Sequence, residues 1–321
     1  MNFENIEIEK KIKIVFMGTP QFCIPVIESL AKQYNVRAII TKPDKPVGRK
    51  GNLVSPPAKK FGNDNNILVF QPEKVDLITE EIKSLMPDVI ITCAYGQIIS
   101  KNILDIPRLG CINVHASLLP KLRGGAPIHR AIMNGFSKTG ITIMYMNEKM
   151  DDGDIIAQQE VIIDEFDTAS SLHDKLSIVG SNLLMKTLPD IILGTNERIK
   201  QDKSQMSLAL TIKREDEKIN FSKTKREVYN QIRGLNSWPG AYCLFEGKIL
   251  KVFECYQTNN YFQTMFDGQI TKIYDDGIGV KVSNGEVVFT SVQLEGKIKM
   301  SAIQFANGIK NKIELIGKVL D

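Results

Sequence analysis

A polar pair near the middle of the chain has residue types suited to acid–base chemistry. Asn113 and His115 stand in the apolar run CINVH, which is typical of a short buried strand. Alternate side chains of a strand share a face, so the amide and the imidazole point the same way. A structural pair that is buried and hydrogen-bonded would show the same pattern. The residues that follow, Ser117 to Pro120 and then Gly124 and Gly125, favour a ligand site at the end of this strand.

An acidic turn farther along could supply a carboxylate to the same site. The run MDDGDII places Asp151, Asp152 and Asp154 beside one glycine. Three carboxylates could form a cation site, and Asp and Gly are also the ordinary residues of solvated turns. No matching set of His or Cys ligands accompanies them, so the sequence predicts no metal. A functional role is favoured for one of them, because a carboxylate beside His115 would hold the tautomer of the imidazole.

The apolar pattern around these residues predicts the sheet that positions them. Strands alternate with helices, which is typical of a doubly wound, Rossmann-like α/β fold with a mostly parallel sheet and ligands at the carboxyl ends of its strands. The first turn, Gly18-Thr19-Pro20, has one glycine and falls short of a dinucleotide-binding fingerprint. The expected strands are 12–17, 36–41, 68–70, 88–93, 111–114 and 141–146, and the expected helices are 22–33, 77–85, 127–134 and 170–186.

Two further segments leave the predicted strands. AYGQII, residues 94–99, could pack its backbone from Gln97 through Ile98 to Ile99 against a flat ligand, and it could equally be a turn into the next helix. The segment 42–60 follows the second strand and is either a solvated insertion or a loop that binds a polyanion. It is rich in Pro and Gly and sets one acid, Asp44, against the cations Lys42, Lys45, Arg49, Lys50, Lys59 and Lys60.

A change of texture near residue 200 predicts two domains. At 321 residues the chain exceeds the usual size of one domain. The polar stretch 195–212 is the candidate linker between a first domain at 1–194 and a second at 213–321. From Tyr242 onward five short alternating strands predict a small OB-like β-barrel. Such a barrel is a common nucleic-acid-binding module, and a solvated spacer domain is the alternative.

Composition places the chain among ordinary globular proteins. Hydrophobic residues make up 43% and charged residues 24%, and the formal net charge of +4 permits an anionic partner without requiring one. Five scattered cysteines with no CxxC pair predict reduced thiols in a cytoplasmic protein. Residues 1–13 are expected to form neither a signal peptide nor a membrane span. His129 and His173 are isolated in the sequence and are expected to be structural.

Together these motifs resemble those of the methionyl-tRNA formyltransferases. The likeness extends over essentially the whole chain and rests on the MGTP turn, the loop KPDKPVGR, AYGQII, GCINVHASLLPKLRGGAPI, MDDGDII and NSWPGA. The long central motif is shared by formyltransferases that use 10-formyltetrahydrofolate, so alone it indicates the reaction and not the acceptor. The basic loop, the barrel and NSWPGA favour tRNA as the acceptor.

The resemblance implies a reaction and the residues for it. The chain would transfer the formyl group of 10-formyltetrahydrofolate to the α-amino group of methionine on initiator Met-tRNA, as a monomer without metal, membrane or obligate protein partner. The implied catalytic residues are Asn113, His115 and Asp151. The implied folate site is lined by Ser117, Leu118, Leu119 and Pro120, with Gln97, Ile98 and Ile99 expected opposite them. The implied tRNA contacts lie in the basic loop, at Lys45, Arg49 and Lys50.

Two alternatives of another kind stay open. A folate-dependent amino-sugar N-formyltransferase would share the central motif and differ in its acceptor. A noncatalytic folate- or RNA-binding protein on the same scaffold would be expected to lack Asn113, His115 or Asp151, and all three are present.

Overall fold

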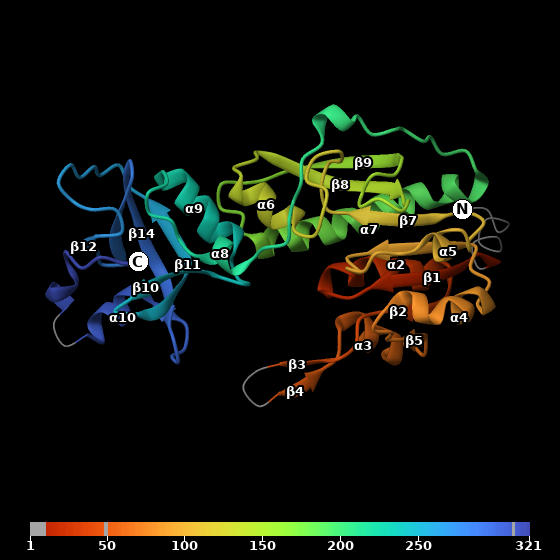
Figure 1. The fold of residues 1–321 in the computed structure, drawn as a ribbon, viewed down its shortest axis with the longest axis horizontal. Coiled ribbons are helices and arrows are strands. Elements are labelled where there is room, and N and C mark those ends of the chain that lie inside the picture. Colours follow the sequence, from red (N-terminus) through yellow and green to blue (C-terminus); the bar gives the residue numbers. More distant parts are fainter. Residues whose placement is uncertain (1–10, 48–50, 310–311) are drawn as a thin grey trace. The chain divides into compact units, whose positions relative to one another are not determined.

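The structure, a computed structural model, describes residues 11–47, 51–309 and 312–321 (Figure 1). Its chain divides into two compact units. The first comprises the residues up to 127, together with 139–162 and 173–209. The second comprises 128–138, 163–172 and 210–321, so two short segments that precede residue 173 in the chain pack within the second unit.

The first unit is built on a seven-stranded sheet with the order β5-β2-β1-β6-β7-β8-β9. The first five of these strands are parallel, and β8 runs antiparallel to β7. The predicted α/β fold with a mostly parallel sheet is therefore confirmed. The strands are β1 (Lys13–Gly18), β2 (Asn35–Ile40), β5 (Leu68–Phe70), β6 (Val89–Cys93), β7 (Cys111–His115), β8 (Lys138–Tyr145) and β9 (Ile155–Ile162).

The central strands are apolar along their whole length because both faces of the sheet are covered. Every residue of β6 is buried, as is every residue of β1 after its first. The covering helices include α2 (Ile24–Gln33), which has a proline in its first turn, where proline is tolerated. The others are α3 (Pro57–Asp64), α4 (Thr79–Ser84), α5 (Lys101–Leu104) and α7 (Ala169–Leu193), with short 3-10 turns at Gln21–Cys23 and Val75–Ile78.

The long helix α7 is a core helix of the first unit. Among the described residues it alone is long and apolar enough to cross a membrane, by length and composition only. Its side chains Leu176, Leu184 and Leu188 are fully buried. At Gly180 a Cβ atom would lie 3.0 Å from Val114 of β7, so the helix packs closely on the strand that carries the candidate site.

The second unit contains the predicted run of short antiparallel strands. They are ordered β10 (Ala241–Phe245), β11 (Lys248–Gln257), β14 (Gly285–Leu294), β13 (Ile278–Val282) and β12 (Ile270–Ile273), and β15 (Met300–Ser301) pairs with β14. Helix α10 (Ala302–Asn307) begins where Ser301 accepts a hydrogen bond from the backbone of Gln304. The unit also holds α8 (Arg214–Glu217), α9 (Lys225–Gly234) and most of α6 (Pro127–Met133).

Candidate active site

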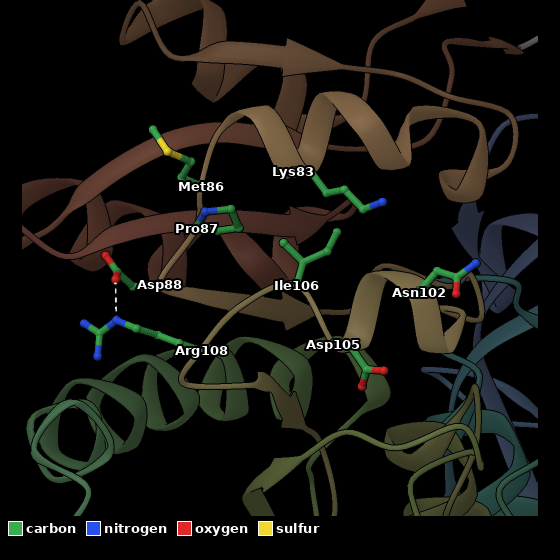
Figure 2. A pocket seen from close by; sticks show the side chains of 8 residues that line it. All are labelled: Lys83, Met86, Pro87, Asp88, Asn102, Asp105, Ile106 and Arg108. Carbon is green, nitrogen blue, oxygen red and sulfur yellow. Dashed lines mark hydrogen bonds and ion pairs between the residues drawn. The ribbon is translucent and has the colours of Figure 1, made fainter.

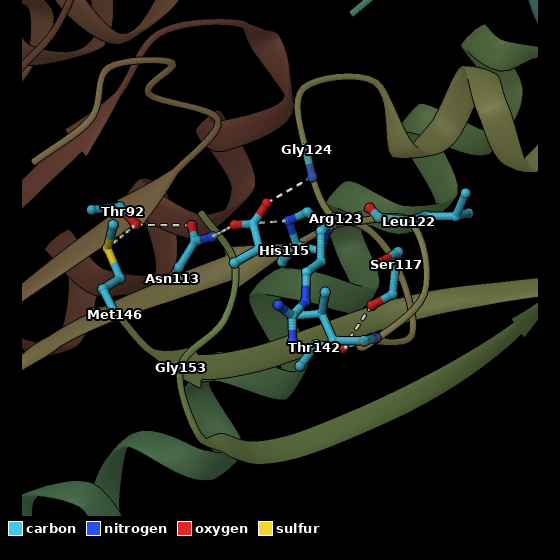
Figure 3. A network of polar contacts seen from close by, with 12 residues as sticks. Thr92, Asn113, His115, Ser117, Leu122, Arg123, Gly124, Thr142, Met146 and Gly153 are labelled. Carbon is cyan, nitrogen blue, oxygen red and sulfur yellow. Dashed lines mark hydrogen bonds and ion pairs between the residues drawn. The ribbon is translucent and has the colours of Figure 1, made fainter. Parts of the chain in front are cut away.

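The carboxylate of Asp151 faces the side chains of both Asn113 and His115. Figure 3 shows Asn113 and His115 within the network of polar contacts around them. Oδ1 of Asp151 lies 3.4 Å from Nδ2 of Asn113, which donates to it, and 3.6 Å from Nδ1 of His115. The His115 side chain is 6% exposed and that of Asp151 14%. The structure therefore brings together, in a nearly dry place, the three residues that the sequence analysis assigned to catalysis. Their roles stay a prediction.

The imidazole of His115 is held on its other side by backbone. Its Nε2 lies 3.1 Å from the carbonyl oxygen of Leu122. A carbonyl oxygen only accepts, so this contact assigns a proton to Nε2. Nδ1 is then an acceptor in the neutral ring and a donor in the charged ring. A proton that arrives at Nδ1 meets the carboxylate of Asp151, which is the arrangement a proton shuttle needs.

The amide of Asn113 is oriented by a residue that the sequence analysis missed. Thr92 of β6 pairs in register with Asn113 of β7, and its hydroxyl donates to Oδ1 of the amide at 2.8 Å. Because the oxygen of the amide is occupied in this way, its NH₂ group is directed toward Asp151. The signal for Thr92 is the one hydroxyl in the otherwise apolar run VIITC.

Two glycines let the loops around Asp151 approach closely. The backbone N–H of Gly124 donates to Oδ2 of Asp151 at 2.8 Å. Gly124 has φ +123°, and a Cβ atom there would lie 2.7 Å from the carbonyl oxygen of Ala209. A Cβ atom at Gly153 would lie 1.8 Å from the carbonyl oxygen of Tyr145. Neither position can take a larger residue without moving backbone.

The predicted folate loop, residues 117–120, is held by a hydroxyl of β8. Thr142 Oγ1 donates to the carbonyl of Ser117 and accepts from the backbone N–H of Leu119. Ser117 is fully buried, and Leu119, 3% exposed, packs against Met144 and Ile155. Leu118 and Pro120 are half-buried. The side chains of Ser117 and Leu119 therefore fix the loop, and Leu118, Pro120 and the loop backbone are left for a ligand.

The segment after β6 presents the large apolar side chain of Ile98 to solvent. Gln97 accepts a hydrogen bond from the backbone of Val75 at 2.9 Å and donates to that of Glu73, so it braces a neighbouring loop. Ile99 lies in the core, whereas Ile98 is 83% exposed. Since β6 and β7 are adjacent parallel strands, the segments 94–99 and 116–120 leave the same edge of the sheet.

The basic segment forms a hairpin of β3 (Lys45–Val47) and β4 (Asn52–Val54) (Figure 1). Lys45 is exposed, and Arg49 and Lys50 lie outside the described residues. The foot of the hairpin is tied down by Asp44, which accepts hydrogen bonds from Lys59 and from Gln71, both at 2.7 Å. These donors, Lys59 foremost, lower the pKa of Asp44 below its usual value.

The remaining carboxylates of the acidic turn are paired with arginines. Asp152 forms an ion pair with the buried guanidinium of Arg123, and Asp154 lies 3.3 Å from Nε of Arg198. Over residues 11–47, 51–309 and 312–321, no three His, Cys, Asp or Glu side chains are grouped so that they could hold a metal ion. The isolated histidines have local partners: His129 contacts the carbonyl oxygen of Gly234, and His173 contacts Asp174.

One hollow of the first unit lies away from this site (Figure 2). Its volume is about 610 Å³, and Asp88 and Arg108 form a hydrogen-bonded ion pair in its wall. Asp88 directly precedes β6, and Arg108 lies just before β7. The hollow is therefore at the amino ends of these strands, opposite to the edge at which His115 ends β7. None of the predicted site residues lines it.

Known proteins resemble this chain over most of its length. Residues 10–188 match the family model described as formyl transferase, and residues 211–310 match its C-terminal domain. The methionyl-tRNA formyltransferase of Bacillus cytotoxicus is 50% identical over 94% of this chain and 97% of its own length. That of Staphylococcus aureus is 46% identical over 96% and 99%. The chain belongs to the methionyl-tRNA formyltransferase family.

Solved structures at lower identity share the fold. The sugar 3N-formyl transferase WlaRD aligns with a TM-score of 0.62 at 23% identity, over 89% of this chain and 99% of that chain. HypX from Aquifex aeolicus aligns with a TM-score of 0.64 at 16% identity, over 95% of this chain and 50% of that chain. The fold of this chain therefore recurs in both of these proteins.

Gly124→Ala is expected to lower the free energy of unfolding by more than 2 kcal/mol, because it adds a backbone clash to the strain of a positive φ. Gly194→Ala is the matched control, since Gly194 has φ +70° in open space and should lose only about 1 kcal/mol. Urea unfolding of the two variants measures the difference. Equal losses would show that the approach of Gly124 to Ala209 is not constrained.

Proposed function

We propose that this protein transfers the formyl group of 10-formyltetrahydrofolate to the α-amino group of methionine on initiator Met-tRNA. The observation that carries the proposal is the contact of one carboxylate oxygen, Oδ1 of Asp151, with both Asn113 and His115. It occurs in a chain that is about half identical, over nearly its whole length, to proteins named for this activity. The proposed product is formyl-Met-tRNA, which serves translation initiation.

Asn113 would stabilise the charge that develops during transfer. When an amine adds to a formyl carbon, negative charge grows on the formyl oxygen. The Nδ2 atom of Asn113 carries two protons, and its contact with Asp151 uses one of them. The second can be donated to that oxygen. One preorganised donor of this kind is worth about 3 kcal/mol of barrier.

His115 and Asp151 would handle the proton that the amine must lose. In the neutral ring, Nδ1 of His115 accepts, while Nε2 stays bonded to the carbonyl of Leu122. The carboxylate of Asp151 stabilises the ring once both nitrogens carry protons. The charged ring would then return this proton to the N10 atom of the folate as the bond between the formyl carbon and N10 breaks. General acid–base assistance of this type contributes roughly 10²–10⁴ in rate.

The surfaces at this edge fit a folate. When bound, 10-formyltetrahydrofolate supplies the formyl group from its N10 atom. Its flat rings need an apolar face and a polar backbone edge, and exposed Ile98 and half-buried Leu118 offer the apolar surface. Ser117, Leu119 and Pro120 would shape the slot from one side, and Gln97 and Ile99 from the other. No metal takes part in this scheme.

The basic hairpin would hold the tRNA. It follows β2, whose carboxyl end lies at the same edge of the parallel sheet as that of β7. Lys45, Arg49 and Lys50 would bind phosphates of the acceptor stem and so bring its 3′ end toward His115. Residues 1–194 would thus act as the catalytic domain and 213–321 as a second tRNA-binding domain, joined by 195–212. The proposed enzyme is a cytoplasmic monomer.

An amino-sugar acceptor is the alternative function. Folds of the same kind occur in sugar formyltransferases, although at identities that show the fold alone. Incubation with 10-formyltetrahydrofolate and either Met-tRNA or an amino-sugar nucleotide separates the two. Formylation of Met-tRNA supports the proposal, and formylation of the sugar nucleotide alone overturns it.

Asn113→Ala, His115→Ala and Asp151→Asn are each expected to lower kcat at least about 100-fold. Asn is chosen at position 151 because it tolerates the φ of +50° there and removes only the charge. Single-turnover formylation of Met-tRNA measures the loss, and circular dichroism checks the fold.

Asp154→Ala serves as the control for this series, since Asp154 pairs with Arg198 and not with the trio. Near-normal turnover in Asp151→Asn, together with an inactive Asp154→Ala variant, would move the carboxylate role three residues along the chain.

Ile98→Asp is expected to weaken folate binding about tenfold or more, because a charge would enter an apolar contact. The side chain is exposed, so folding should be unaffected. Calorimetry gives the Kd for folate, and the Kd for Met-tRNA should not change. Leu77→Asp, at an exposed leucine of the same unit, is the matched control. If Ile98→Asp binds folate as tightly as the control, the segment 97–99 does not line the slot.

Arg49→Ala is expected to raise the KM for Met-tRNA several-fold and to leave the Kd for folate unchanged. A lost phosphate contact should also reduce the slope of log Kd against log salt by about 0.7–0.9. Titrations of Met-tRNA over a range of salt concentrations measure this slope. Lys83→Ala is the control, because Lys83 lines the hollow at the opposite edge of the sheet. An unchanged slope in Arg49→Ala would show that the loop is a solvated insertion that does not bind tRNA.

A further inference from the structure

The segment 199–209, which we call the strap, is bonded to two loops of the candidate active site. Ile199 and Ile155 exchange two backbone hydrogen bonds of 2.8 Å, which attach the strap behind the acidic turn. At the other end of the strap, the backbone N–H of Arg123 donates to the carbonyl of Ser207 at 2.9 Å. The carbonyl of Arg123 accepts from the backbone N–H of Ala209 at 2.7 Å. The strap lies within the segment 195–212, which the sequence predicts to be a polar linker. In the structure its single β-bridges to Ile155 and Arg123 attach it to the first unit.

The strap also fixes the residue that holds His115. The backbone N–H of Leu122 donates to Oγ of Ser207 at 3.0 Å. The carbonyl of the same leucine contacts Nε2 of His115. A displacement of the strap would therefore shift the position of the His115 imidazole as well as that of the acidic turn.

Gln201 joins the two loops through one side-chain amide. Its Nε2 donates to the carbonyl oxygens of Asp151 and Gly153, each at 2.8 Å. Its Oε1 accepts from Nε and Nη2 of Arg123 at 3.1 and 2.7 Å. Arg123, which is buried, completes the ring through its ion pair with Asp152. Both protons and the oxygen of the amide are thus used.

The turn at Asp151 needs such support. Asp151 has φ +50°, a left-handed conformation that costs a non-glycine residue on the order of 1–2 kcal/mol. Strained conformations persist only where surrounding contacts determine them. A return to the right-handed region would swing the carboxylate away from Asn113 and His115.

We propose that Gln201 is a positioning residue for formyl transfer. It holds the backbone of Asp151 in the left-handed conformation that aims Oδ1 at Asn113 and His115. It acts through Asp151 and not on the substrates. The proposal rests on the proposed function, in that formylation is its kinetic readout.

The test compares Gln201→Leu and Gln201→Glu with Gln205→Ala. Leucine removes both donors and the acceptor, and glutamate keeps the acceptor toward Arg123 but loses the donors toward the turn. Gln205 is exposed on the same strap, and its side chain donates to Asp202. Both Gln201 variants should lower kcat about 10- to 100-fold with KM values within about twofold, and Gln205→Ala should match the wild type.

A double-mutant cycle with Asp151→Asn separates positioning from general stability. If Gln201 acts through the Asp151 carboxylate, Gln201→Leu should lower kcat little further once that charge is gone. A full, additive loss in the Asp151→Asn background would overturn the proposal, and so would wild-type kcat in Gln201→Glu.

Nuclear magnetic resonance of the His115 ring nitrogens tests the same point without any substrate. The signals are assigned by their loss in His115→Gln. Gln201→Leu and Gln201→Glu should shift them in the direction seen in Asp151→Asn, whereas unchanged signals would overturn the proposal. Since this readout needs no acceptor, it holds even if the wild type fails to formylate Met-tRNA, which would count against the proposed function alone.

Discussion

The site depends on where one carboxylate oxygen is placed. Oδ1 of Asp151 contacts the amide of Asn113 and the imidazole of His115. The carboxylate comes from a different part of the chain than the other two groups. The strand β7 supplies the amide and the ring at fixed spacing. The acidic turn supplies the carboxylate from 36 to 38 residues away along the chain, so the contact exists only while the turn is held against the strand.

The parallel sheet provides the rigid half of this arrangement. Thr92 and Asn113 are register partners on neighbouring strands, and so the hydroxyl reaches the amide without any loop being ordered. Strands buried on both faces have little freedom to shift, because a change of register would move apolar residues out of the core. Loops then need to hold only the carboxylate and the ligand surfaces.

Local pattern predicted the sheet and the pair on β7, because alternation and buried apolar runs are recorded in neighbouring residues. The roles of Thr92 and Gln201 were missed for a different reason: each acts through a contact between residues that lie 21 to 78 positions apart. The polar composition of segment 195–212 predicts a linker. Two of its polar side chains, Gln201 and Ser207, form hydrogen bonds with the backbone of the site loops. Ser117 and Leu119 are predicted to line the folate site, and their side chains also secure the loop that carries them, which the local pattern does not reveal.

A charged group in a site without water needs hydrogen-bond donors from the protein that are already in place before the substrate binds. Removing a carboxylate from water costs several kcal/mol unless its lone pairs find donors. In Asp151, Oδ2 receives the N–H of Gly124, and Oδ1 receives the amide of Asn113 and faces the imidazole. Backbone donors do not have to reorganise as charge moves during a reaction, which makes them efficient in catalysis. The glycine at 124 is required for the same reason, since only a residue without a side chain lets that N–H lie between Ala209 and the carboxylate. Close packing of backbone, and not the number of charges, thus sets what this site can do.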